Sequence, residues 1–171
     1  MLSQVLGQTR SSRRAVTLAA FLVVLDAFYL NQGVIAALVG AGLLLIGVPR
    51  ALTAKLSEVR RQRLRNLGIY FTAVVLVFAL DAANNHLART RAEHLVVAVK
   101  AYQAKYHRYP QSLNDLMPEF VDRVPLAKYT LAFNEFHYFT SKRGTHLFYV
   151  ALPPFGRPGY SFVRDQWTSL D

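Results

Sequence analysis

The chain carries the sequence LGIYFTAVVLVFALDAA at Leu67–Ala83, an apolar stretch of the length that crosses a lipid bilayer. A spanning helix needs about 20 mostly apolar residues, with a lower limit of about 17. Two further apolar stretches precede it, AVTLAAFLVVLDAFYL at Ala15–Leu30 and GVIAALVGAGLLLIGV at Gly33–Val48. Only Asn31 and Gln32 separate these two, so we expect them to form a tight transmembrane helical hairpin. The sequence therefore predicts three membrane spans, with the hairpin covering residues 15–48.

The first apolar stretch also has features of a signal peptide, because a basic segment precedes it. However, residues 25–33 read LDAFYLNQG, which is bulky where a cleavage site needs small residues, and another apolar stretch follows at once. We expect the first span to be retained.

Basic residues are concentrated beside the apolar stretches. Of the formal net charge of +10, residues 1–14 contribute +3 and residues 49–66 contribute +5. Basic segments that flank spans lie in the cytoplasm, so we expect a cytoplasmic N-terminus, a cytoplasmic loop at 49–66 and an extracytoplasmic domain at 84–171. In a bacterial inner membrane that domain is periplasmic. The same placement accounts for the charge without nucleic acid, since neither a groove-reading helix nor an aromatic–basic platform accompanies it.

The segment 84–171 is long enough for one small core. The chain contains no cysteine, so this domain has no disulfides, and lipid anchoring through a lipoprotein Cys is excluded.

No Pro or Gly occurs between Ile69 and Tyr106, which predicts that the third span at 67–83 continues into a long extramembrane helix. Beyond the membrane this helix carries an apolar stripe at three- and four-residue spacing. The stripe consists of Leu95, Ala98, Val99, Tyr102 and Tyr106. We expect the helix to end near Tyr106–His107, because Pro110 disfavours a helical Tyr109 and His tolerates the left-handed cap conformation.

The remaining chain predicts a short helical turn and then strands. Ser112–Asp115 resembles a capping box. Aromatic and β-branched runs separated by turn residues predict antiparallel strands. These runs are Tyr129–Phe133, Phe136–Thr140, Thr145–Leu152 and Tyr160–Arg164, with Trp167 in a last short strand or packed over the sheet. The predicted fold class is α+β, with the long helix packed on a small antiparallel sheet.

The sequence AYQAKYHRYPQSLNDL at 101–116, followed by aromatic strands, resembles the type IV pilin and type II secretion pseudopilin family. The resemblance covers about residues 100–171 and implies a pilin-like soluble domain, with a sheet laid on the helix. A pilin leader and processing site do not precede the third span, so the resemblance implies the fold and a pilin-like interaction surface rather than filament assembly.

Two acidic residues lie within the apolar stretches, Asp26 in the first and Asp81 in the third. Intramembrane acids are candidates for ion or proton pathways. Both lie near the predicted outer boundary, so interfacial anchoring or hydrogen bonding between helices is the alternative interpretation.

The sequence predicts no catalytic, cofactor-binding or metal site. His86, Glu93 and His94 share one helix face but lack the i,i+4 His pair of a helical metal motif. The Pro153–Gly159 loop combines a restricted backbone with an aromatic residue, Phe155, and a cation, Arg157. We therefore expect this loop to contact another protein.

Three functions remain open. The leading hypothesis is a non-enzymatic inner-membrane protein whose pilin-like domain binds another envelope protein, as an accessory or assembly subunit. The second is a subunit of a proton or ion pathway that uses Asp26, Asp81 and His86. The third is a membrane immunity-type protein that neutralises a toxin. The sequence indicates the lipid bilayer and an envelope protein as partners and no nucleic acid, small-molecule substrate or cofactor.

Overall fold

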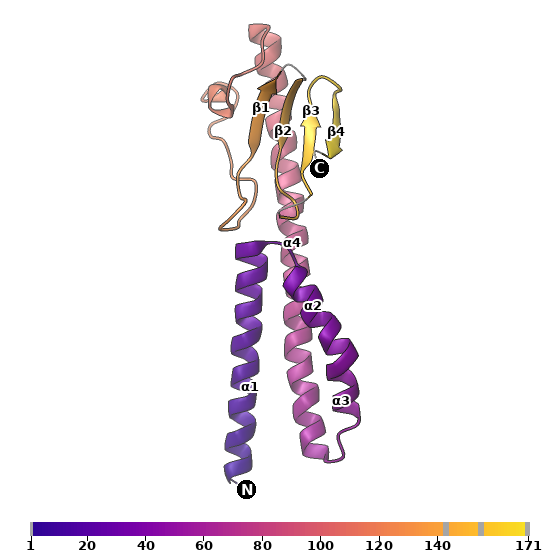
Figure 1. Ribbon diagram of the computed structural model, residues 1–171. Helices are drawn as coiled ribbons and strands as arrows, with labels where there is room; N and C mark the ends of the chain where they lie inside the picture. Colours follow the sequence, from indigo (N-terminus) through magenta and orange to yellow (C-terminus); the bar gives the residue numbers. More distant parts are fainter. Residues whose placement is uncertain (1, 142–143, 154–155, 170–171) are drawn as a thin grey trace. The chain divides into compact units, whose positions relative to one another are not determined.

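The computed structural model describes the chain except at residues 1, 142–143, 154–155 and 170–171 (Figure 1). The chain divides into two compact units, Met1–Asp81 and Ala82–Asp171. One long helix, α4 (Ser57–Tyr106), contributes residues to both units. With its four-stranded antiparallel sheet in the second unit, the protein has the predicted α+β class.

The first unit is helical. Its elements are α1 (Leu2–Val23), a π-helical segment (Val24–Leu30), α2 (Val34–Gly42), a second π-helical segment (Leu43–Gly47), α3 (Val48–Leu52) and the first part of α4. The chain reverses between Leu30 and Val34, where Asn31 and Gly33 both have positive φ, 50° and 66°. Small side chains let the helices approach closely: Ala19, Ala36 and Ala73 are buried together with Val74 and Val77 of α4.

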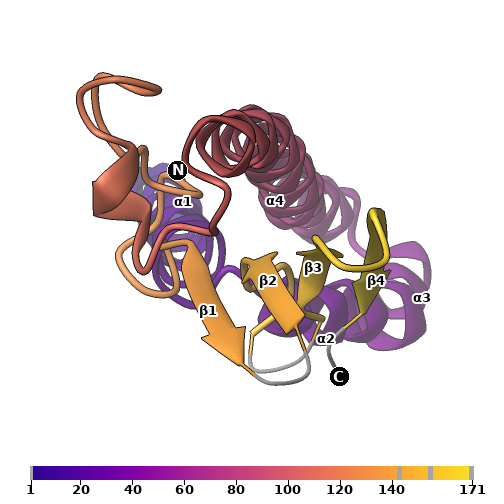
Figure 2. The ribbon, with the colours of Figure 1, turned by 90° about the horizontal axis from the view of Figure 1, so that it is seen from above.

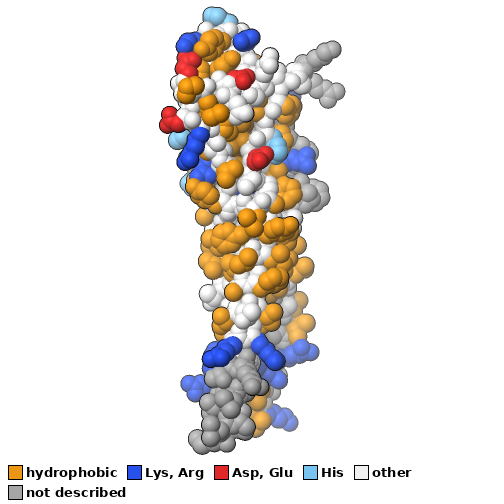
Figure 3. Space-filling view, turned by 90° about the vertical axis from the view of Figure 1, so that its left-hand side faces the viewer, with side chains coloured by type: hydrophobic (Ala, Val, Ile, Leu, Met, Phe, Trp, Pro, Cys, Tyr) orange, Lys and Arg blue, Asp and Glu red, His pale blue; other side chains and the backbone are white. Residues whose placement is uncertain are grey.

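Two described helical segments, Val34–Leu52 and Ser57–Tyr106, are long and apolar enough to cross a membrane. Many large apolar side chains of the first unit are exposed, among them Phe21, Leu38, Leu45 and Val75. On the face shown in Figure 3, hydrophobic side chains cover much of this unit, and Lys and Arg gather at one end.

Helix α4 begins earlier than the sequence predicted. We expected a loop at residues 49–66 and a helix from Leu67, but α3 covers Val48–Leu52 and α4 starts at Ser57. Residues 57–66 are mostly good helix formers, and Glu58 in the first turn favours the positive end of the helix dipole. The basic residues of this segment therefore extend the helix as exposed side chains.

The second unit is a sheet packed on the outer part of α4. The strands β1 (His137–Ser141), β2 (Gly144–Phe148), β3 (Pro158–Ser161) and β4 (Gln166–Ser169) are adjacent in chain order and antiparallel. Seen from above, α4 lies along one face of the sheet (Figure 2). The core joins the predicted helix stripe, except for Tyr106, to the inward residues of the strands. Its buried members include Leu95, Val99, Tyr102, Leu147, Tyr160 and Phe162. Tyr106 was predicted to belong to the stripe but is 42% exposed, because it lies in the last turn of α4 at the end of the sheet unit's helix.

One predicted strand is wrong. Residues 129–133 form an irregular loop, in which Thr130 and Asn134 bond to nearby carbonyl oxygens in place of a strand partner. The other predicted strands correspond to β1, β2 and β3 with shifted ends, and Trp167 lies in β4.

The helix end and the turn after it are confirmed. Helix α4 ends at Tyr106, and His107 takes the left-handed conformation at φ 55°. Ser112 and Asp115 form the predicted capping box around a 3₁₀ helix at Leu113–Leu116. The Asp115 carboxylate accepts backbone N–H bonds from Ser112 at 3.0 Å and Gln111 at 2.7 Å, and these bonds lower its pKa.

Candidate interaction surface

The intramembrane candidate Asp26 lies at the hairpin turn and is completely buried. Its carboxylate accepts hydrogen bonds from the backbone N–H groups of Gly33 at 2.9 Å and Ala36 at 2.7 Å. These N–H groups lie at the start of α2, where a helix has no partners of its own. Asp26 therefore caps α2 across the turn, which corresponds to the hydrogen-bonding interpretation of this residue.

Asp81, in α4, lies close to the same turn. A Cβ placed on Gly33 would lie 3.1 Å from Asp81 Oδ2 and 3.0 Å from a ring carbon of Phe78. Glycine is thus required at this position for two reasons, its positive φ and the close approach of α4. Both acids therefore lie close to Gly33.

The histidine candidates do not converge on a site. His86, Glu93 and His94 have exposed side chains on α4. Among the described residues, no group of three His, Cys, Asp or Glu side chains is arranged to hold a metal ion.

The predicted contact loop is partly described. Phe155 lies outside the described residues, whereas Arg157 is exposed. Arg157 lines a shallow hollow of about 340 Å³, together with Gly156, Pro158, Trp167, Thr168 and Ser169. The base of the loop is fixed, because Ala151 N–H donates to Gly156 O at 2.7 Å and the buried Lys128 donates to Ala151 O at 2.8 Å.

The sheet face turned away from α4 carries four stacked rings, which we call the outer aromatic patch. Its members are His137, Phe139, His146 and Phe148. His137 pairs with Phe148 across β1 and β2 with ring centroids 4.8 Å apart, and Phe139 pairs with His146 at 5.2 Å. Phe139 also meets Phe148 edge to face at 6.1 Å and is 41% exposed. Strand alternation puts these rings outside, because Tyr138 and Leu147 between them point to the core.

The outer aromatic patch and the hollow are neighbours in the sheet. Phe148 pairs with Gly159, and Gly159 pairs with Thr168 of the hollow. The rings and the hollow therefore lie on adjacent strands, whereas the sequence predicted a contact surface at the Pro153–Gly159 loop, with Phe155 and Arg157.

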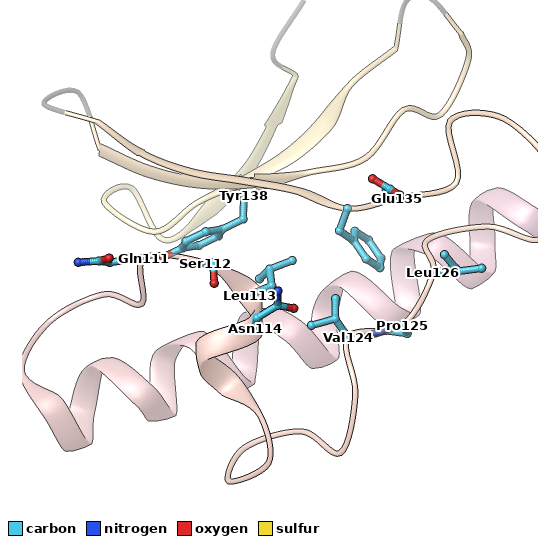
Figure 4. A pocket seen from close by; sticks show the side chains of 10 residues that line it. Gln111, Ser112, Leu113, Asn114, Val124, Pro125, Leu126, Glu135 and Tyr138 are labelled. Atoms are coloured by element: carbon cyan, nitrogen blue, oxygen red, sulfur yellow. The ribbon is translucent and has the colours of Figure 1, made fainter.

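A separate cavity of about 460 Å³ lies beside β1 (Figure 4). Leu113, Val124 and Tyr138 line it, and the Glu135 carboxylate turns away from Leu113 and Val124. Its hydroxyls are engaged in the fold: Tyr138 donates to Pro110 O at 3.0 Å, and Ser112 bonds to Asp115.

Two ion pairs fasten α4 to the rest of the second unit. Lys100 bonds to Asp165, which also accepts from the Tyr160 hydroxyl. Lys105 bonds to Glu119, which also accepts from the Tyr106 hydroxyl at 2.8 Å. The hydrogen bonds to Lys100 and Tyr160 lower the pKa of Asp165. Both ion pairs therefore join α4 to other parts of the second unit.

Comparisons of the chain with protein-family models, with curated proteins and with solved structures find no significant match.

Proposed function

We propose that this chain is a non-enzymatic, multi-pass membrane protein whose second unit binds another envelope protein through the outer aromatic patch. The observation that carries the proposal is the set of four stacked rings on the free sheet face. Aromatic side chains dominate the energetics of protein interfaces, and rings already stacked lose little conformational entropy on binding. Arg157 at the neighbouring hollow supplies the other residue type that is enriched in hot spots.

The position of β1 supports the same surface. β1 is an edge strand of the four-stranded sheet, and Phe139 at its centre is exposed. An edge strand offers unpaired backbone groups to an incoming chain. A partner segment could therefore combine backbone hydrogen bonds to β1 with contacts to the rings.

The membrane part of the proposal rests on the two apolar helices and on the charge distribution. We propose that both basic segments face the cytoplasm and that the second unit is periplasmic in a bacterial inner membrane. The bonds of Asp26 to Gly33 and Ala36 give this acid a structural task, so a proton pathway is not needed to explain it. The resemblance to pilins is compatible with a helix packed on a sheet and with an assembly role.

Site-specific photo-crosslinking in cells tests the proposal. Phe139 is replaced with benzoylphenylalanine in the full chain, and the matched control places the same group at Val97, which is 67% exposed on α4. We expect position 139 to give a protein adduct of defined mass that the control lacks and that His137→Ala with Phe148→Ala abolishes. The same adducts at both positions, or none at 139, would refute the proposed surface.

A further inference from the structure

The segment 126–134, which we call the apolar loop, exposes four large apolar side chains within nine residues. They are Leu126 at 48%, Tyr129 at 62%, Leu131 at 75% and Phe133 at 47%. The only charged side chain of the segment, Lys128, is completely buried. The exposed surface of the apolar loop is therefore uncharged, which is uncommon for a connection that faces water.

Internal hydrogen bonds give the apolar loop a fixed shape. Ala127 N–H donates to Asn134 O at 2.7 Å, and the Asn134 side chain donates to Thr130 O at 2.9 Å. The Thr130 hydroxyl donates to Ala132 O at 2.9 Å. These bonds close the backbone of the apolar loop on itself, and in this conformation its four large apolar side chains are exposed.

Two residues of α4 hold the apolar loop in place. Asn84 Oδ1 accepts the backbone N–H of Tyr129 at 3.2 Å. Arg91 donates to Leu126 O at 2.7 Å and to the Tyr129 hydroxyl, and its guanidinium lies 4.5 Å from the centre of the Tyr129 ring. The apolar loop is therefore attached to the first three turns of α4 within the second unit.

Asn84 and Arg91 determine the position of the apolar loop along α4. Asn84 directly follows the apolar stretch 67–83 in the same helix. At about 1.5 Å per residue, Asn84 lies roughly 1.5 Å and Arg91 roughly 12 Å beyond the end of that stretch. The interfacial zone on each side of the hydrocarbon core is roughly 5–8 Å thick. The backbone of Tyr129 thus falls at the level of the lipid headgroups if α4 crosses a membrane.

We infer that the apolar loop inserts into the headgroup region of the membrane, with Leu131 and Phe133 as the apolar contacts and Tyr129 as the interfacial aromatic. Tyr is enriched at this depth because its ring is apolar and its hydroxyl polar. An uncharged tip with exposed apolar side chains fits a lipid interface, where such side chains are buried at the boundary between headgroups and acyl chains. The inference rests on the proposed membrane placement of α4 and adds a second, peripheral attachment of the extracytoplasmic unit.

Spin labels test the inference on the full chain in phosphatidylglycerol–phosphatidylcholine nanodiscs. Because the natural chain has no cysteine, single labels can be placed at Leu131→Cys, Val75→Cys and Gln103→Cys. Gln103 is exposed near the far end of α4 and serves as the aqueous control. Collisions with oxygen report lipid, and collisions with nickel–EDDA report water. Each variant must retain the thermal unfolding curve of the parent.

We expect the label at Leu131 to be accessible to oxygen and to collide with nickel–EDDA several-fold less often than the label at Gln103. A Leu131 label as accessible to nickel–EDDA as Gln103, while Val75 reports lipid, would overturn the inference and leave the membrane placement intact. A Leu131 label protected from both reagents would also overturn it, since a protein rather than lipid would then cover the loop. A Val75 label that reports water would refute the membrane placement itself.

Discussion

Replacing Asp26 with Ala should destabilise the first unit strongly, because the residue closes the turn between the π-helical segment and α2. Its buried carboxylate accepts two backbone N–H bonds, at 2.9 and 2.7 Å. A hydrogen bond to a charged group contributes about 1.5–3 kcal/mol, and loss of a cap residue costs about 0.5–2 kcal/mol. Non-additivity of the two bonds makes a total of about 2–4 kcal/mol a reasonable expectation for Asp26→Ala. Asp26→Asn keeps one acceptor oxygen, so we expect it to reduce the free energy of unfolding by about half as much as Asp26→Ala.

The assay is reversible unfolding of the full chain in mixed micelles, followed by circular dichroism. The matched control is Gly42→Ala at the end of α2, the helix that Asp26 caps, because a Cβ at Gly42 meets no atom within 4 Å. That change should be neutral or stabilise by up to about 1 kcal/mol. If Asp26→Ala unfolds within about 0.5 kcal/mol of the parent, the capping role is wrong, and the acid would again be a candidate for ion or proton transfer.

Three further outcomes are expected. Val99→Asp should cost several kcal/mol in thermal unfolding of the second unit, since Val99 is fully buried under the sheet; unchanged melting would show that the helix does not need this contact. Asp115 has a lowered pKa, so its contribution to stability is present above its unfolded pKa of about 3.9 and is lost as pH falls through the folded value; parent and Asp115→Asn should therefore converge in acid, and parallel curves from pH 6 to pH 2 would contradict this. A cysteine at Ser141 should react with an impermeant maleimide in intact spheroplasts and one at Ser57 should not, whereas the reverse labelling would invert the topology.

Local chemistry predicted the features that depend on neighbouring residues in the sequence. Pro110 and His107 determine where α4 ends, and Ser112 with Asp115 determines the turn that follows. The apolar stripe of the helix could also be read directly, because its three- and four-residue spacing survives in the folded core.

The predictions were wrong where contacts between residues far apart in the sequence determine the local structure. The run Tyr129–Phe133 has strand-like composition, but Asn84 and Arg91 of α4 bind its backbone and its tyrosine hydroxyl, and no strand forms. A single sequence contains no signal for these contacts, which join positions 35 to 45 residues apart. The outer aromatic patch could not be predicted from the sequence for the same reason, because the register of β1 and β2 determines which rings stack.

The apolar loop and strand β4 are both attached to the same short part of α4. Arg91 and Asn84 hold the apolar loop, while Arg89 lies 3.4 Å from the ring centroid of Trp167 in β4 and pairs with Glu93 at 2.7 Å. Cation–π contacts of this kind stabilise by about 0.5–2 kcal/mol. Strand β4 and the apolar loop are therefore both attached to α4 at residues 84–91.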